Sequence, residues 1–163
     1  MKASEIIKIG SNLLKEKKIQ SHILDSELLL SKTLNKSREE ILINLDQKIG
    51  KKNISTFKEF LKRRSKCEPI AYILEEKEFW SNKFFVTKDT LIPRPETELL
   101  VEKLLKMYDG KKISILDIGT GSGCIIIRLL NNLKKSKGIG IDISKKAIYE
   151  TKKNAFRYKL FNR

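Results

Sequence analysis

The chain has 163 residues, 40% hydrophobic and 34% charged, a balance that is typical of a folded globular protein and excludes a disordered one. The longest apolar stretch, residues 125–130, is interrupted by Arg128 and is far shorter than the roughly 18 residues of a membrane span. The N-terminus carries Glu5 and no long apolar segment, so we expect no signal peptide and a cytoplasmic protein. Cys67 and Cys124 have no ligand-like spacing, so neither a disulfide framework nor a metal site is predicted.

The net charge of +15 comes from 28 lysines and only seven arginines. Arginine is preferred where proteins bind phosphates and bases specifically, because its planar guanidinium can donate two parallel hydrogen bonds. A scattered lysine excess is typical of a solvated surface, and the 22 isoleucines beside it indicate an AT-rich coding sequence. We therefore expect no dedicated nucleic-acid site, although a basic surface favours an RNA-rich partner.

The first part of the chain has the periodicity of helices. Apolar residues recur at helical spacing in residues 6–14 and again in residues 23–29. The segment Ser37–Glu40 has the pattern of a capping box at the start of a third helix. A fourth helix is predicted over Ser55–Ser65. We predict a small helical bundle over residues 1–68.

The next segment, residues 69–92, changes to a β pattern. Phe79-Trp80 and Phe84-Phe85-Val86 are β-favouring runs, and Ser81-Asn82-Lys83 between them is typical of a hairpin turn. We therefore predict a β-hairpin linker in this segment.

The last third alternates helices and strands. Pro95 opens a helix that ends at Asp109-Gly110. The apolar runs 113–118 and 138–143 have the length of strands, and a helical pattern follows each of them. This order predicts a parallel strand pair with a right-handed crossover. The fold class is therefore α+β, a helical bundle and a hairpin followed by a βαβα unit over residues 93–163.

A glycine-rich turn, Gly119-Thr120-Gly121-Ser122-Gly123, directly follows the first of these strands. Glycines let the backbone reverse tightly and let a ligand approach, and the next helix begins with unpaired N–H groups. Asp142 ends the second strand, where a carboxylate can accept both hydroxyls of an adenosine ribose. Because parallel strands carry both features to one edge of the sheet, we predict that loop and carboxylate share one ligand.

The spacing of the glycines narrows the choice of ligand. A dinucleotide fingerprint has the form G-x-G-x-x-G, and a P-loop ends in Gly-Lys-Ser/Thr. Here the form is D-x-G-x-G-x-G from Asp117, which resembles motif I of the Rossmann-like S-adenosylmethionine-dependent methyltransferases. The alternative is a plain tight turn in an α/β fold, which the apolar strand before the loop and the acid-ended strand after it disfavour.

Three stretches, in this order, resemble the HemK-type release-factor glutamine methyltransferases. They are Glu68-Pro69-Ile70-Ala71-Tyr72-Ile73 with Glu78-Phe79-Trp80, then Leu91-Ile92-Pro93-Arg94-Pro95-Glu96-Thr97-Glu98, then Asp117–Gly123 with Asp142-Ile143-Ser144. The second stretch is the most diagnostic, because the sister enzymes that methylate a ribosomal-protein glutamine tend to carry Pro-Arg-Ser-Pro there. The resemblance covers essentially the whole chain, with one departure at Glu75, where the family usually has glycine.

The resemblance implies methyl transfer from S-adenosylmethionine to the side-chain amide nitrogen of the glutamine in the Gly-Gly-Gln motif of class I peptide chain release factors. It implies that Gly119, Thr120, Gly121, Ser122, Gly123 and Asp142 bind the cofactor. Arg94 and Glu98 are weaker candidates near the site, for which a salt bridge at the helix start is an equal alternative. Residues 1–68 would then recognise the protein substrate, residues 93–163 would be the first part of the methyltransferase domain, and the protein would be a monomer without metal.

One motif of the family is missing. The catalytic signature Asn-Pro-Pro-Tyr needs adjacent prolines, and the three prolines of this chain, Pro69, Pro93 and Pro95, are never adjacent. We therefore assign no catalytic residue, and we expect the N-terminal portion of such an enzyme, with a two-stranded sheet that lacks partners and no measurable cofactor binding by itself. A non-catalytic module that docks on a release factor or the ribosome stays open as an alternative.

Overall fold

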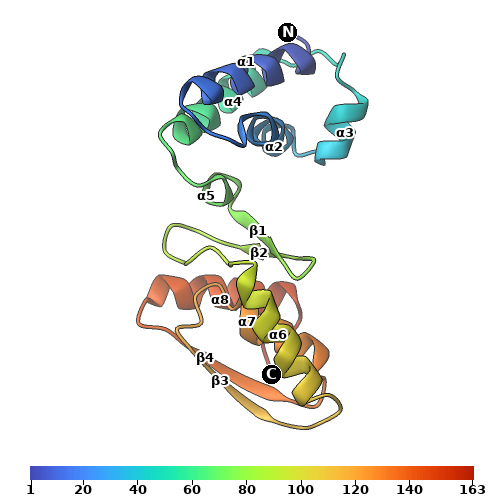
Figure 1. Cartoon of the computed structure of the whole chain (residues 1–163), viewed down its shortest axis with the longest axis vertical. Coiled ribbons are helices and arrows are strands. Elements are labelled where there is room, and N and C mark those ends of the chain that lie inside the picture. Colours follow the sequence, from blue (N-terminus) through green and yellow to red (C-terminus); the bar gives the residue numbers. More distant parts are fainter. The chain divides into compact units, whose positions relative to one another are not determined.

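The computed structural model describes residues 1–163, and the chain divides into two compact units, Met1–Leu74 and Glu75–Arg163 (Figure 1). The first unit is all helical, and the second combines three helices with two small sheets. The α+β class predicted from the sequence is therefore confirmed. None of the helices combines the length and the apolarity that crossing a membrane requires.

The helical unit consists of α1 (Ala3–Glu16), α2 (His22–Leu34), α3 (Arg38–Ile43), α4 (Lys51–Ser65) and α5 (Ile70–Leu74). Their apolar faces form one core, in which Leu14, Leu29 and Phe57 are almost fully buried. Gly10 makes this packing possible, because a Cβ atom at that position would lie 2.8 Å from the Phe57 ring. Buried Asp25 of α2 is paired with Arg64 of α4, with 2.7 Å between Oδ2 and Nε.

The boundaries in this unit show where the sequence was misleading. The capping box is confirmed, since the Ser37 hydroxyl accepts from the Glu40 amide and the Glu40 carboxylate accepts from the Ser37 amide. The fourth helix begins at Lys51 and not at Ser55, with Gly50 as its N-cap. Its early turn carries little apolar signal, so the periodicity alone placed the start too late.

Helix α5 was not foreseen and occupies part of the segment predicted as a hairpin linker. The Pro69 carbonyl accepts the amides of Tyr72 and Ile73, so Pro69 caps the start of this helix directly before Ile70. Proline is tolerated there because the N–H it lacks would have no partner within the helix. Glu75 ends the helix with φ of +59°, in the left-handed region that favours glycine. This is the position where the family resemblance predicts a glycine.

The second unit opens with a β-hairpin of β1 (Glu76–Phe79) and β2 (Asn82–Phe85). The hairpin is confirmed, but its turn consists of Trp80 and Ser81 and not of residues 81–83. Both turn residues have positive φ, +51° and +56°, as a two-residue turn between twisted strands demands. Residue types alone do not predict this turn, because neither Trp80 nor Ser81 is Gly, Asn or Asp.

The rest of the unit runs through α6 (Glu96–Met107), β3 (Ser114–Ile118), α7 (Cys124–Asn132), β4 (Lys137–Ile141) and α8 (Lys145–Arg157). The predicted parallel pairing is confirmed, with Leu116 opposite Ile139. Helices α7 and α8 lie on one side of this sheet (Figure 1). Gly138 allows that approach, because a Cβ atom there would lie 2.8 Å from Ile126 of α7.

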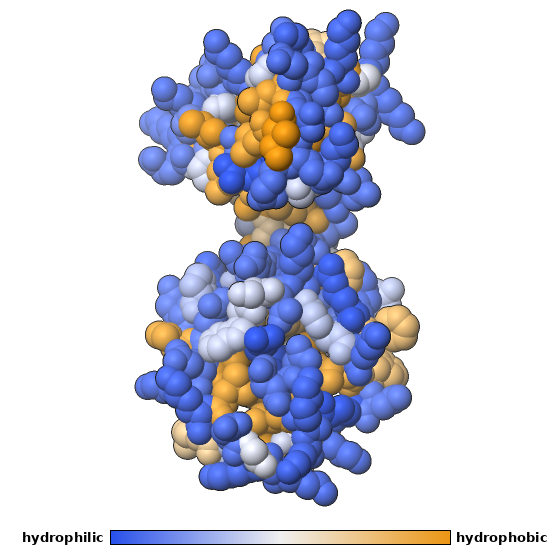
Figure 2. Space-filling view, turned by 90° about the vertical axis from the view of Figure 1, so that its right-hand side faces the viewer, coloured by the Kyte–Doolittle hydropathy of each residue, from blue (hydrophilic) through white to orange (hydrophobic).

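The other side of the β3–β4 sheet is uncovered. Its side chains are aliphatic and exposed: Leu116 at 59%, Ile118 at 76%, Ile139 at 65% and Ile141 at 44%. The core of the unit lies on the opposite side, between the hairpin, α6 and α7. In the space-filling view, apolar side chains interrupt the mostly hydrophilic surface of both units (Figure 2).

Candidate functional site

The loop between β3 and α7 has a conformation that only glycine adopts without strain. Gly119, Gly121 and Gly123 have φ of +77°, +56° and +78°. Gly123 is also a point of close approach, because a Cβ atom there would lie 2.8 Å from the Thr151 methyl carbon of α8. The three glycines are therefore needed for the shape of the loop and for its contact with α8.

The structure brings Asp142 and this loop together. The Gly121 amide donates to Asp142 Oδ2 over 3.0 Å, and the Ser144 amide donates to Oδ1 over 2.9 Å. These two hydrogen bonds, the one from Ser144 foremost, hold the pKa of the Asp142 carboxyl below its ordinary value. The carboxylate is ionised at neutral pH, and each oxygen keeps a further lone pair for a ligand hydroxyl.

The two polar side chains of the loop are turned inward. Thr120 is 6% exposed, and its hydroxyl donates to Asp117 Oδ2 over 2.8 Å. It packs against Gly140 of β4, where a Cβ atom would lie 2.9 Å from its hydroxyl oxygen. Ser122 is 2% exposed. The surface that the loop offers to a ligand is therefore backbone, which places Thr120 and Ser122 beneath the candidate site.

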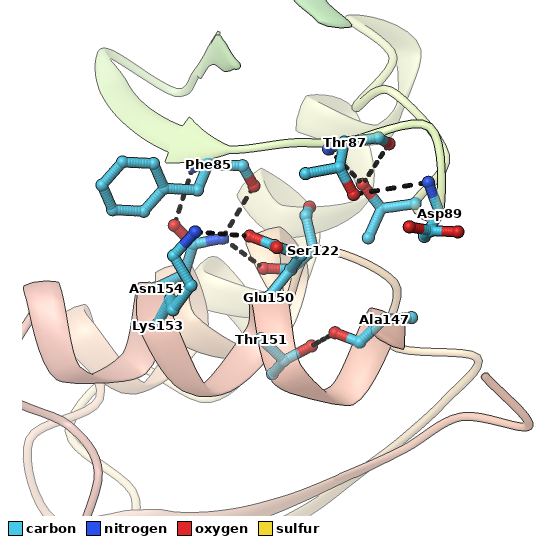
Figure 3. A network of polar contacts seen from close by, with 10 residues as sticks. Phe85, Thr87, Asp89, Ser122, Ala147, Glu150, Thr151, Lys153 and Asn154 are labelled. Atoms are coloured by element: carbon cyan, nitrogen blue, oxygen red, sulfur yellow. Dashed lines mark hydrogen bonds and ion pairs between the residues drawn. The ribbon is translucent and has the colours of Figure 1, made fainter. Parts of the chain in front are cut away.

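Helix α8 holds the loop from below (Figure 3). The Thr151 hydroxyl lies 2.8 Å from the Gly121 carbonyl oxygen and 3.1 Å from that of Ala147, which share its single proton. Asn154 Nδ2 donates to the Ser122 carbonyl over 2.8 Å. Two consecutive loop carbonyls are thus fixed by two side chains one turn apart on the helix.

Asn154 also binds the hairpin. Its Oδ1 accepts from the Phe85 amide over 2.8 Å, and its Nδ2 donates to the Phe85 carbonyl over 3.0 Å (Figure 3). The residue is fully buried, and its amide is satisfied by three main-chain groups from two distant segments. Sequence reasoning missed Thr151 and Asn154. The available signal was an asparagine inside a helix, where it is disfavoured unless its side chain has a specific partner.

The two weaker candidates, Arg94 and Glu98, differ in their contacts. Glu98 Oε1 accepts the Trp80 amide over 2.8 Å, so this carboxylate is tied to the hairpin turn. Arg94 is exposed ahead of α6. No hydrogen bond or ion pair joins either residue to the glycine loop or to Asp142. No contact therefore assigns either residue to the site, and their role there stays a prediction.

The cysteines differ in environment. Cys67 is exposed, whereas Cys124, the first residue of α7, is buried. Burial raises the pKa of the Cys124 thiol to about 11, so it is protonated at neutral pH. No group of three or more His, Cys, Asp or Glu side chains gathers where it could hold a metal ion. Cys124 therefore contributes packing beneath the loop and no nucleophile.

Comparison with known proteins yields two families and several relatives. Residues 5–74 match the family described as PrmC N-terminal domain, and residues 109–162 match a family described as methyltransferase domain. A release factor glutamine methyltransferase from Leptospira interrogans is 40% identical over 93% of this chain and 54% of its own length. One from Buchnera aphidicola subsp. Baizongia pistaciae is 42% identical over 99% of this chain and 58% of its own. A bifunctional methyltransferase from Rickettsia conorii is 36% identical over 98% of this chain and 35% of its own.

These matches confirm the resemblance inferred from the motifs. Residues 5–74 are similar to the PrmC N-terminal domain family and residues 109–162 to a methyltransferase-domain family, and the chain as a whole is similar to proteins named release factor glutamine methyltransferase. It spans about half the length of these two relatives. The glycine loop and Asp142 both lie within the segment that matches a methyltransferase domain.

Proposed function

We propose that this relative of the release factor glutamine methyltransferases holds S-adenosylmethionine at the loop between β3 and α7 and serves methyl transfer to the glutamine of the Gly-Gly-Gln motif in peptide chain release factors. The observation that carries the proposal is the hydrogen bond from the Gly121 amide to Asp142. This hydrogen bond holds the ionised Asp142 carboxylate beside the glycine loop, whose two polar side chains, Thr120 and Ser122, are buried. The names of the relatives support the protein substrate.

The residues present fit such a cofactor. No heavy atom lies within 4 Å of a Cβ built on Gly119, and the nearest to one on Gly121 is 3.9 Å away, so there is open space over the loop. Asp142 retains acceptor capacity for the two hydroxyls of a ribose. The first turn of α7 adds backbone N–H groups at the same place.

The bound cofactor supplies an electrophilic methyl group on a sulfonium. The residues of this chain hold and orient it: Asp142 fixes the ribose, while Thr151 and Asn154 keep the loop in shape from beneath. An amide nitrogen is a poor nucleophile, so the reaction depends on orienting its lone pair toward the methyl carbon. We assign that orienting role to no residue here, because the chain lacks the Asn-Pro-Pro-Tyr signature.

In this proposal the helical bundle over residues 1–68 recognises the release factor, residues 69–92 link it to the cofactor segment at residues 93–163, and the protein works in the cytoplasm. A second candidate is a non-catalytic module that docks on a release factor or the ribosome. The observation that favours it is the helical core, which is closed within Met1–Leu74 and draws on no residue of the second unit.

The proposal is tested by transfer of a tritiated methyl group from S-adenosylmethionine to a class I release factor. The chain is assayed alone and together with the part of the Leptospira relative that it does not match. We expect transfer only in the mixture, and at least a tenfold loss with Asp142→Ala. Asp109→Ala, an exposed acid near the end of α6, is the matched control and is expected to keep full transfer.

Transfer that survives Asp142→Ala contradicts the assigned cofactor site. A release factor that co-purifies with the chain while no methyl group is transferred in the mixture supports the docking module.

A further inference from the structure

Helix α8 and the second hairpin strand share an open hollow of about 400 Å³. Its lining consists of three aromatic rings and three cationic side chains: Phe85, Tyr149, Lys152, Lys153, Phe156 and Arg157. The walls are apolar, because they are formed by the rings and by the carbon chains of the cations. Neither the glycine loop nor Asp142 contributes to the lining, so the hollow is separate from the candidate cofactor site.

Phe85 is the half-buried ring of the hollow and contacts two of its cations. The Lys153 ammonium nitrogen lies 4.7 Å from the centroid of this ring, and the Arg157 guanidinium carbon lies 4.4 Å from it. Lys153 also forms an ion pair with Glu150 over 3.1 Å. Arg157 forms one with Glu76 over 3.0 Å. These contacts position both cations and offset their charge, so the two side chains shape the hollow and supply little free positive charge.

The other two rings of the hollow are exposed, Tyr149 at 63% and Phe156 at 76%. They are seven residues apart on α8, which places them on one face of the helix about 10 Å apart along its axis. Lys152 lies on this face between the two rings, and Lys145 lies one turn before Tyr149. Both lysines are exposed, and neither takes part in an ion pair. We call Lys145, Tyr149, Lys152 and Phe156 the α8 stripe.

The α8 stripe alternates positive charges with exposed rings, a combination that suits an anionic ligand with flat apolar groups. Helix α8 carries five cations and one acid, so its field attracts anions. We propose that the α8 stripe and the hollow beside it bind single-stranded nucleic acid. Lys145 and Lys152 contact phosphates, and unpaired bases stack on Tyr149 and Phe156. This inference goes beyond the proposed function and does not depend on the cofactor site.

An acidic polypeptide is the competing ligand for the α8 stripe. Interfaces between proteins are enriched in aromatic residues but depleted in lysine, whereas a basic groove with exposed rings is typical of proteins that bind single strands. In a duplex the bases stack on one another, so only a single strand offers its base faces to the rings. The lysine excess of the whole chain predicted no dedicated nucleic-acid site, because composition does not show that two lysines and two rings share one helix face.

The test measures the fluorescence anisotropy of a labelled oligouridylate of about 12 nucleotides, titrated with the full chain at about 50 mM salt. We expect the double variant Tyr149→Ala/Phe156→Ala to weaken binding about tenfold or more, because each ring loses a stacked base. Both rings are exposed, so the thermal unfolding midpoint of the double variant should stay that of the parent. The matched control is Phe161→Ala, at a 58% exposed ring outside the hollow, and it is expected to bind as the parent does.

The phosphate contacts are tested by the dependence of binding on salt. We expect Lys152→Gln to flatten the plot of log affinity against log salt concentration by about 0.7, the value for one phosphate contact of a single strand. Lys103→Gln, at an exposed lysine of α6, is the matched control and should keep the slope of the parent. An oligothymidylate of the same length distinguishes DNA from RNA, and a duplex of that length is expected to bind more weakly than either single strand.

A chain that binds neither single strand overturns the proposal, as does binding that the two ring substitutions leave unchanged. Displacement of the oligouridylate by an equal concentration of oligoglutamate also overturns it and assigns the α8 stripe to an acidic polypeptide. Asp142→Ala is expected to bind the oligouridylate as the parent does. Strand binding that persists in this variant while methyl transfer fails in the parent leaves the α8 stripe assigned and contradicts the proposed function alone.

Discussion

The two units solve the burial of their apolar residues differently. In the helical unit, three amphipathic helices and two short ones meet around a single core that includes Leu29, Phe57 and Leu61. In the second unit, the helices cover one side of a two-stranded parallel sheet and leave the other side open. A helical bundle is completed by contacts between neighbours in sequence, whereas a parallel sheet needs strands from far along a chain. One unit is therefore self-sufficient, and the other presents an apolar surface.

The largest expected effect on the free energy of unfolding comes from replacing a leucine of the helical core, and a leucine of the second unit provides the comparison. Leu29→Ala removes a fully buried side chain from the helical core, and we expect it to lower the free energy of unfolding by about 2–5 kcal/mol. Leu116→Ala lies on the uncovered side of the β3–β4 sheet, and we expect a change of about 0.5 kcal/mol or less. Urea titrations followed by circular dichroism measure both. Equal losses would contradict the difference drawn between the two units.

Asn154→Leu tests the buried amide of the second unit. The substitution leaves the Phe85 amide, the Phe85 carbonyl and the Ser122 carbonyl without their partner, at a cost of about 1–3 kcal/mol for each group that finds no water. We expect about 3 kcal/mol of destabilisation in the second unit and none in the helical unit, resolved by hydrogen exchange. Asn132→Leu, at the exposed end of α7, is the matched control. Equal losses from the two variants would refute the role given to Asn154.

The pH dependence of Asp142 provides a smaller effect. Its hydrogen bonds lower the pKa of the folded state below the ordinary value of 3.8, so the folded form binds a proton less readily than the unfolded form. The stabilisation is present above pH 3.8 and is lost as the pH falls through the folded pKa. We therefore expect Asp142→Asn to lower the thermal midpoint of the second unit at pH 7, and the difference from the parent to shrink toward pH 2. A difference that does not vary with pH would exclude this assignment.

The smallest expected effect lies at the end of α5. Glu75 has a left-handed backbone, which costs a residue with a side chain more than it costs glycine. We expect Glu75→Gly to raise the free energy of unfolding by up to about 1 kcal/mol, as measured in urea. Glu59→Gly in the interior of α4 is the control and is expected to lower it by a similar amount. A loss of stability with both variants would show that the Glu75 side chain matters more than its backbone.

Much of this fold follows from local signals in the sequence. The apolar periodicity of α1 and α2, the Ser37 capping box and the two apolar strands were predicted correctly because each depends on residues close together in the chain. The two-residue turn at Trp80 and Ser81 was missed, because the pairing of Glu76 with Phe85 overrides the turn preferences of both residues. Helix α5 was missed because a proline more often indicates the end of a helix than its beginning, and Pro69 stands directly before the first residue of α5.

In the candidate site, too, local sequence signals located some residues and not others. The glycine loop and Asp142 could be located because they follow two strands of one parallel pair, and the structure brings them into contact. Thr151 and Asn154 could not, because their partners are main-chain atoms whose positions depend on the folded arrangement of loop and helix. The inward orientation of Thr120 likewise depends on its packing against Gly140 of β4, which the residues next to Thr120 in the sequence do not reveal.

Asn154 connects the hairpin to the glycine loop through hydrogen bonds from a single side chain. One amide group bridges Phe85, 69 positions earlier in the chain, and Ser122, 32 positions earlier. A force that tilts the second hairpin strand must either break this bridge or pull the loop along with it. A protein that binds the hairpin and displaces β2 would therefore also shift the backbone of the glycine loop, without contacting the loop itself.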